Sequence, residues 1–321
     1  MKLLLKSLIL AAAALAAGPA PAQPAYPTKS IRLIVPFPPG GAVDIVGRAL
    51  AQRLSSAIGQ QVVVENKPGA NGAVGVDYVA KAAPDGYTAV LSALGAITII
   101  PHAQKTPYDP LKDLVPVTQV VALTLAWVAR ADLPASNIRD LIKLAQGGTR
   151  LAAGTSGNGS PNHLAVEQFN LMAGTHILHV PYKGEGPAIT DLVGGQIDLV
   201  VTTLIAAAPQ LKGGRIKAIA AAGAKRPSAM PELATVGESG LPGYEAQAWQ
   251  GVFVPAGTPR EIVARLNAEI VKILRSAEMR DFLLASGTEP VGNSAAEFTA
   301  YVQDESARYG KLIARIGLKL D

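Results

Sequence analysis

The chain has 321 residues, of which 49% are apolar and 17% are charged, and it contains no cysteine. Disulfides, thiolate metal sites, cysteine nucleophiles and a lipid-modified N-terminal cysteine are therefore excluded. The 29 basic and 24 acidic residues are interspersed and only 5% of residues are aromatic, so the composition excludes the basic stripe with interleaved aromatics that is typical of nucleic-acid binders.

The first 22 residues have the pattern of a cleavable signal peptide. Lys2 and Lys6 precede a short apolar block at residues 7–17, and residues 20–22 (APA) fit a small-residue cleavage site. A membrane-spanning helix needs about 20 apolar residues, so an uncleaved anchor is the less favoured alternative. We expect residues 1–22 to be removed and the mature chain to be periplasmic, without a lipid anchor or stable membrane insertion, if the organism has two membranes.

The segment that follows the leader, residues 31–44, predicts an anion site. Residues 31–35 form an apolar, β-branched run of strand length, and prolines and glycines interrupt it at residues 36–41. A helical pattern starts at Asp44. A strand that ends in a glycine turn and opens a helix presents backbone N–H groups at the positive end of the helix dipole, where a carboxylate binds favourably.

The rest of the chain alternates between strand and helix patterns. Strands are expected at residues 61–65, 88–91, 151–153, 176–180, 199–202 and 216–221, and helices at 74–82, 137–145, 161–172, 259–275 and 295–316. This alternation is typical of α/β lobes with mainly parallel sheets and helices on both faces.

Two apolar runs, residues 123–129 and 248–254, bracket the middle of the chain and are expected to be crossing strands. The length is large for one core, so the simplest topology enters a second lobe on the first run and returns on the second. Lobe 1 then comprises residues 23–124 and 249–321, and lobe 2 residues 125–248, with a ligand cleft between them. One continuous domain is the alternative.

A second glycine-rich loop, residues 154–160, precedes a helix that opens at Pro161 inside the predicted second lobe. Thr155, Ser156 and Ser160 supply hydroxyl groups, and the glycines let the backbone approach a ligand closely. Either glycine loop alone could be a helix cap with a tight turn. One such loop in each lobe, both facing the cleft, favours ligand binding.

Motifs for catalysis and for metal binding are missing from the sequence. Residues 154–158 (GTSGN) depart from a nucleophile elbow at their last position, and no phosphate loop or dinucleotide fingerprint is present. The four histidines lack metal-site spacing. His163, in the first helical turn after the second loop, could donate a hydrogen bond to a carboxylate, or it is an ordinary exposed histidine. We expect no catalytic residue, no metal and no cofactor.

Eight motifs, in order along the chain, resemble those of one protein family. They are residues 35–41 (VPFPPGG) with Asp44, 64–72 (VENKPGANG), 84–88 (PDGYT), 108–113 (YDPLKD), 159–163 (GSPNH), 179–184 (HVPYKG), 191–198 (DLVGGQID) and 249–259 (WQGVFVPAGTP). The resemblance covers essentially the whole chain from Tyr26 onward. The chain resembles the periplasmic receptors of tripartite tricarboxylate transporters, the TctC/Bug family of solute receptors.

This resemblance implies a two-lobed periplasmic binding protein of type II, in which each lobe is a mainly parallel sheet flanked by helices and two crossing strands join the lobes. Such a receptor is not an enzyme. It closes around a small carboxylate as a monomer and delivers it to membrane transporter subunits. A receptor that signals to a membrane sensor is the alternative, and a secreted hydrolase is a less favoured one because no nucleophile–base pair is evident.

The resemblance also implies that the first loop holds one end of the ligand. The residues on this side are Phe37, Pro39, Gly40, Gly41 and Ala42. Their backbone N–H groups, apart from the proline, which has none, would donate to a carboxylate. Asp44 would fix the loop by hydrogen bonding instead of touching an anionic ligand, because like charges repel.

The second loop would hold the far end of the ligand. Its residues are Thr155, Ser156, Asn158 and Ser160, supported by His163. Tyr182 and Lys183 follow the strand at residues 176–180 and would line the mouth of the cleft. Lys183 would pair with a second carboxylate, or it is a solvated surface lysine.

Two segments depart from the family pattern. Residues 92–98 are largely apolar where relatives often carry small polar residues, and residues 201–203 (VTT) stand where many relatives place an aspartate. Ser92 and Thr202 remain ligand-binding candidates at these positions. Since an aspartate there could pair with an ammonium group, its absence favours a non-amino acid with an apolar body.

Overall fold

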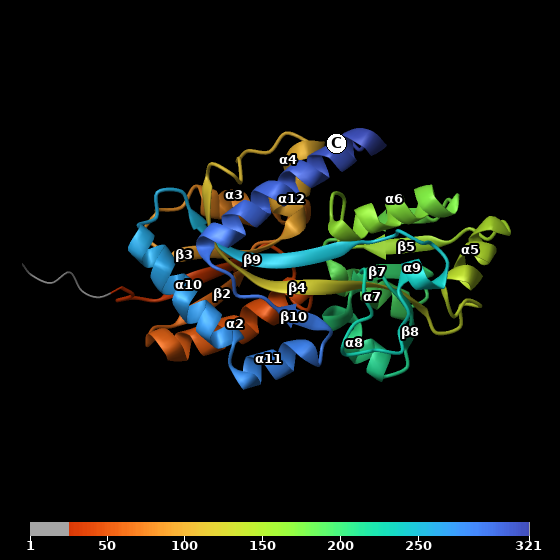
Figure 1. The fold of residues 1–321 in the computed structure, drawn as a ribbon, viewed down its shortest axis with the longest axis horizontal. Coiled ribbons are helices and arrows are strands. Elements are labelled where there is room, and N and C mark those ends of the chain that lie inside the picture. Colours follow the sequence, from red (N-terminus) through yellow and green to blue (C-terminus); the bar gives the residue numbers. More distant parts are fainter. Residues whose placement is uncertain (1–25, 321) are drawn as a thin grey trace, which may run out of the picture.

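The computed structural model describes residues 26–320 of the chain (Figure 1). The predicted signal peptide, residues 1–22, lies outside the described residues. Within the described part, no helix is both long enough and apolar enough to cross a membrane.

Helices and strands alternate along the chain, as the sequence pattern predicts. The first elements are β1 (Ile31–Val35), α2 (Ala42–Ile58), β2 (Val62–Asn66), the 3-10 turn η1 (Ala70–Gly72), α3 (Ala73–Ala80), β3 (Thr88–Ala93), the π-helical turn η2 (Gly95–Ile99), α4 (Ile100–Ala103) and β4 (Leu114–Arg130). The middle elements are α5 (Ile138–Gln146), β5 (Ala152–Thr155), α6 (Pro161–Ala173), β6 (Leu178–Pro181), α7 (Glu185–Val193), β7 (Leu199–Thr203), α8 (Leu204–Lys212), β8 (Ile216–Ala221) and α9 (Val236–Ser239). The last are β9 (Gln247–Pro255), α10 (Arg260–Leu274), α11 (Ala277–Leu284), β10 (Thr288–Pro290) and α12 (Ala295–Ile316).

The strands form one curled sheet in the order β2-β1-β3-β9-β4-β7-β5-β6, with β10 and β8 also paired to β4. The α/β class is confirmed, but the expectation of mainly parallel sheets is wrong. Pairing is parallel only at the two ends of the sheet, where β1 joins β2 and β3, and β5 joins β6 and β7. It is antiparallel around β4 and β9, because β4 leaves the first part of the sheet and β9 returns to it.

Strand β4 belongs to both ends of the sheet. It pairs with β9 from Leu114 to Thr124, and with β7 and β8 from Leu125 to Arg130. We call the part with β2, β1, β3, β9 and the start of β4 the first half-sheet, and the part with the end of β4, β7, β5, β6 and β8 the second half-sheet. Of the two expected crossing strands, β4 runs through both parts of the sheet, and β9 carries the chain back: it begins beside Ala222 of the second half-sheet and then pairs with β4 and β3.

Helices cover both faces of each half-sheet (Figure 1). In the first half-sheet, buried apolar residues of α2, α10 and α11 pack on one face, and those of α3, α4 and α12 pack on the other. In the second, α5, α6 and α9 cover one face, and α7 and α8 cover the other. The largest apolar cluster runs through both half-sheets, so the two parts share one continuous core along β4.

Candidate ligand-binding site

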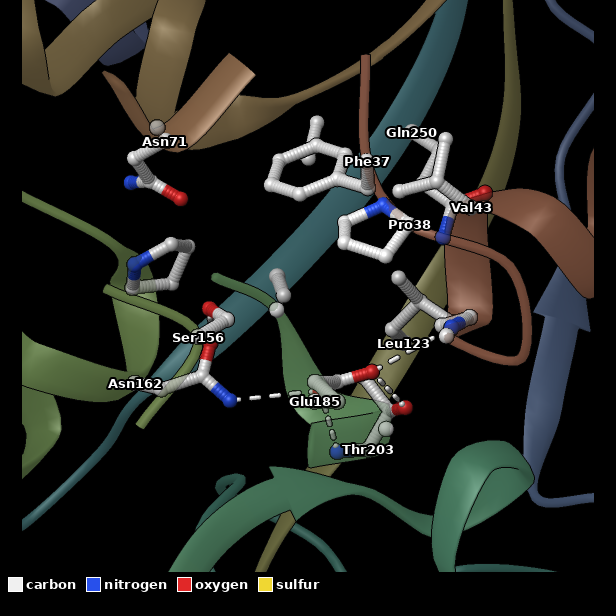
Figure 2. A pocket seen from close by; sticks show the side chains of 18 of the residues that line it. Phe37, Pro38, Val43, Asn71, Leu123, Ser156, Asn162, Glu185, Thr203 and Gln250 are labelled. Carbon is white, nitrogen blue, oxygen red and sulfur yellow. Dashed lines mark hydrogen bonds between the residues drawn. The ribbon is translucent and has the colours of Figure 1, made fainter. Parts of the chain in front are cut away.

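A pocket lies where loops and helix starts of the two half-sheets face each other (Figure 2). From the first half come Phe37, Pro38, Gly41, Ala42, Val43, Asn71, Ala93, Gly95, Leu123, Ala248 and Gln250, and from the second half come Ser156, Pro161, Asn162, Gly184, Glu185, Gly186, Pro187 and Thr203. Most of these side chains are apolar or uncharged, which is typical of a site for a small organic molecule.

The loop before α2 forms one wall of the pocket. Gly40 has a φ of 87°, a left-handed conformation that favours glycine, and Gly41 is an extended N-cap without a side-chain cap. Behind the loop, the buried Asp44 carboxylate accepts hydrogen bonds from the Gly40 N–H at 3.1 Å and from Asn66 Nδ2 at 2.9 Å. Burial alone would raise the pKa of Asp44, but the hydrogen bonds from Arg48, Asn66 and Gly40 lower it below its usual value. Asp44 thus holds the turn from outside the pocket.

A carboxylate of the protein itself already meets the start of α2. Both oxygens of Glu185 are hydrogen-bonded: Oε1 accepts from the Thr203 N–H at 2.8 Å and from Asn162 Nδ2 at 3.2 Å. Oε2 accepts from Thr203 Oγ1 at 2.9 Å and from the Ala42 N–H at 3.3 Å. Glu185 therefore links the first half-sheet to the second across the pocket, and it is only 8% exposed.

Two other polar side chains in the pocket have no partner. Gln250 on β9 is fully buried, and neither its Nε2 nor its Oε1 makes a hydrogen bond in the structure. Nδ2 of Asn71, from η1, is also buried and unpartnered. Leaving a buried polar group unpaired costs about 1–3 kcal/mol. These two amides can donate to, and Gln250 can accept from, a polar molecule that enters the pocket.

The second loop contributes one hydroxyl to the pocket. Ser156 lines it and donates from Oγ to Asn162 Oδ1 at 3.1 Å, which orients the Asn162 amide toward Glu185 (Figure 2). Thr155 turns the other way, with Oγ1 at 2.7 Å from His179 Nε2. Ser160 is the N-cap of α6 and accepts from the His163 N–H at 3.0 Å.

His163 does not reach the pocket, and it is not an exposed histidine either. Its Nδ1 accepts from the Gly159 N–H at 3.2 Å, its Nε2 lies 3.6 Å from Glu167 Oε1, and its ring stacks on His179 with 3.8 Å between centroids. Since both ring nitrogens face protein groups, the expected hydrogen bond to a ligand is not supported. Burial, with His163 nearby, lowers the pKa of His179 to about 4.

An adjoining cavity of about 330 Å³ opens beside the pocket and shares Phe37, Asn71 and Ser156 with it. Asn158, Tyr182 and Lys183 line this cavity. The hydroxyl of Tyr182 donates to Asp191 Oδ2 at 2.8 Å, and Lys183 is exposed.

The structure thus brings together only part of the predicted site. Phe37, Gly41, Ala42 and Ser156 line the pocket, and Asn158, Tyr182 and Lys183 line the adjoining cavity. The predicted residues that line neither are Pro39, Gly40, Asp44, Ser92, Thr155, Ser160, His163 and Thr202. Ser92, Thr155 and Thr202 each directly precede a lining residue, namely Ala93, Ser156 and Thr203. Ser92 and Thr202 lie in strands, where successive side chains point to opposite faces, so their side chains point away from the face of their lining neighbours.

Sequence reasoning missed the most distinctive polar residues of the pocket. Asn71 and Gln250 lie inside quoted motifs, and Glu185 directly follows another. Gln250 had a usable signal, since it is a polar residue within an otherwise apolar strand. Glu185 and Asn162 had none, because their roles depend on contacts between distant parts of the chain.

The comparisons with known proteins agree with this architecture. The model of the "Tripartite tricarboxylate transporter family receptor", TctC, matches residues 46–318. The chain belongs to this family. Protein BugT of Bordetella pertussis is 35% identical over 301 residues, which cover 92% of this chain and 91% of that protein.

Two solved structures of this TctC receptor's relatives were determined with dicarboxylates. Rpa4515 of R. palustris with adipate is 36% identical, with a TM-score of 0.88 over 92% of this chain and 99% of that one. MatC (Rpa3494) from Rhodopseudomonas palustris with bound malate is 31% identical, with a TM-score of 0.84 over 90% of this chain and 100% of that one. The chain is therefore a periplasmic solute-binding receptor by fold and family, and these are not the fold and family of an enzyme.

Proposed function

We propose that this TctC receptor binds a small carboxylate in the pocket between its half-sheets and delivers it to a tripartite tricarboxylate-type membrane transporter. The observation that carries the proposal is the buried, unpartnered amide of Gln250 together with the buried, unpartnered Nδ2 of Asn71 inside the pocket. A ligand with polar ends would supply the missing partners. The adipate and malate complexes of the two relatives support a carboxylate as its class.

In this proposal the two half-sheets are the lobes of the receptor, residues 23–124 with 249–321 and residues 125–248. Residues 1–22 direct export to the periplasm. The lobes turn about β4 near Thr124 and Leu125, where the strand changes partners. Ligand between the lobes favours the closed form by mass action, which amounts to about 2.7 kcal/mol of stabilisation at a hundredfold excess over Kd.

A thermal-shift screen of residues 23–321, refolded to remove carried ligand, tests the function. The panel holds dicarboxylates, citrate, acidic amino acids, nicotinate and benzoates, and we expect at least one carboxylate to raise Tm clearly. Gln250→Met should abolish that shift and leave the ligand-free Tm unchanged or higher, because it removes an unpaired buried amide at nearly constant volume.

The matched control is Gln52→Met on the exposed face of α2, which should keep the full shift. A panel without any stabilising carboxylate would contradict the proposed function. If the ligand raises the Tm of Gln250→Met as much as that of the unaltered protein, this pocket is not the binding site.

A further inference from the structure

The pocket carries one charged group, and that charge is negative. Among the residues that line it, the side chain of Glu185 is the only charged one; the other polar side chains are neutral amides and hydroxyls. In this pocket the protein supplies a carboxylate and no cation. The Glu185 carboxylate therefore repels a second negative charge that a ligand brings close to it.

Glu185 is held at this position from several sides. Its oxygens accept four hydrogen bonds, which is about the capacity of a carboxylate. Two of the donors are backbone N–H groups at the starts of α2 and α8, from Ala42 and Thr203, where the helix dipole favours an anion. Of the backbone N–H groups that the sequence predicts as an anion site at the start of α2, that of Ala42 therefore already donates to a side chain of the same protein.

The two ends of the pocket differ. Asn71 and Ser156 also line the adjoining cavity, which contains the exposed Lys183, so we call this the outer end. Gln250 lines only the pocket, so we call its side the inner end. Glu185 also lines only the pocket, but it is linked to Ser156 through the hydrogen bonds of Asn162. Figure 2 shows Asn71 and Ser156 on one side of Phe37 and Gln250 on the other.

Each end suits a different part of a ligand. At the outer end, the unpartnered Nδ2 of Asn71 is a free donor and Lys183 contributes positive charge, which fits a carboxylate. At the inner end, Gln250 offers one neutral donor and one neutral acceptor, and none of the described residues that line the pocket is a cation. A hydroxyl, an amide or an amine fits there, whereas a second carboxylate does not.

We propose that Glu185, the one charged group among the described residues of the pocket lining, restricts this receptor to monocarboxylates, whose carboxylate lies at the outer end while a group that is not anionic lies against Gln250. This inference rests on the proposed function and narrows its ligand class. It sets the chain apart from the relatives whose structures hold the dicarboxylates adipate and malate.

The test uses compounds that differ only at one end. Calorimetry near pH 7, where all their carboxyl groups are ionised, compares adipate with 6-hydroxyhexanoate and 6-aminohexanoate, and succinate with 4-hydroxybutyrate and 4-aminobutyrate. Within the series whose carbon chain fits the pocket, we expect both monocarboxylates to bind at least about tenfold tighter than the dicarboxylate. Glu185→Gln, which keeps the shape and removes the charge, should selectively strengthen dicarboxylate binding and close this gap.

Glu305→Gln is the matched control, because Glu305 is also buried but bonds to Arg308 and Trp249, away from the pocket. It should leave the gap intact. The order of affinities of the six compounds is measured on the unaltered protein and does not depend on any variant. The proposal therefore stays testable even if Glu185→Gln fails to fold.

Three outcomes overturn the proposal: a dicarboxylate that binds as tightly as its monocarboxylate partners, a gap that Glu185→Gln leaves unchanged, or no binding of any of the six compounds to either form. The proposed function fails separately, when the wider carboxylate panel gives no stabilisation. Tight dicarboxylate binding would thus refute the role of Glu185 and uphold the receptor.

Discussion

At the scale of single residues, we expect His179, whose ring stacks on His163, to make the stability of the protein sensitive to acid. The Nε2 of His179 lies 2.7 Å from Thr155 Oγ1, and burial beside His163 lowers the pKa of His179 to about 4. In the unfolded chain a histidine titrates near pH 6.5. Between about pH 6.5 and pH 4 the unfolded state therefore binds more protons, and the free energy of unfolding falls as the pH falls.

Replacing His179 by glutamine should remove part of this pH dependence. The amide can still bond to Thr155, but it does not titrate, so the free energy of unfolding should fall less steeply from pH 6.5 to pH 4 than in the unaltered chain. Urea unfolding at several pH values measures the slope. His176→Gln, at an exposed position in the same segment, should keep the original slope. Equal slopes in all three proteins would show that His179 is not the acid-sensitive group.

At the scale of elements, the contact between β9 and α12 depends on a glycine. A Cβ atom added to Gly251 would lie 2.2 Å from Cζ of Phe298, whose buried ring packs edge-on against Trp249 at 5.5 Å between centroids. Because Phe298 is enclosed, it has little room to move. Gly251 thus lets α12 approach the middle of the sheet closely.

Gly251→Ala should destabilise the protein by roughly 1–3 kcal/mol through overpacking. Adding Phe298→Leu should restore part of the lost stability, because the smaller side chain leaves room for the new methyl group. The double variant should then be more stable than the sum of the two single changes predicts. Urea unfolding of the four proteins measures the coupling. Gly223→Ala serves as control, since its added methyl group would meet no atom closer than 3.8 Å. Strict additivity would contradict the close contact.

Elements with uninterrupted apolar patterns could be predicted from the sequence, and interrupted ones could not. The bounds of β1, β8 and α12 match the expected ranges. The start of β4 was missed because Pro116, Thr118 and Gln119 break its apolar run. The structure accommodates this break: Thr118 Oγ1 donates to the Asn293 carbonyl at 2.7 Å, and the Gln119 N–H donates to Asn293 Oδ1 at 2.9 Å.

The parts of the pocket that depend on local sequence patterns could be predicted, and the parts that depend on distant contacts could not. Both glycine loops were located, since each combines a strand end, glycines and a helix start within a few residues. The contact between Ala42 and Glu185 joins residues 143 positions apart, and no local pattern encodes it. α7 and α8 were also missed. Pro209 stands inside α8, where a proline normally ends a helix, whereas Pro187 lies in the first turn of α7, where a proline is tolerated and is no reason for the omission.

At the scale of the whole molecule, both half-sheets supply walls of the pocket, so a bound ligand should restrain them together. With the carboxylate that gives the largest thermal shift, we expect slower hydrogen exchange at residues 37–43 and at residues 184–187 alike. Residues 138–146, in α5, lie outside the pocket lining and should keep their exchange rates. Mass spectrometry of peptides from these segments measures the effect. Slowing on one side only would mean that the ligand does not bridge the half-sheets.

The position of β9 also sets the order in which the chain can assemble. Strand β3 ends at Ala93, and its antiparallel neighbour β9 begins only at Gln247 (Figure 1). Until that late segment is available, one edge of β3 has no partner, whereas β5 to β8 can join the end of β4 at once. Pairings so distant in sequence form slowly. The middle of the chain is therefore expected to be complete first, and the residues that are synthesised earliest in the first half-sheet are among the last to reach their final neighbours.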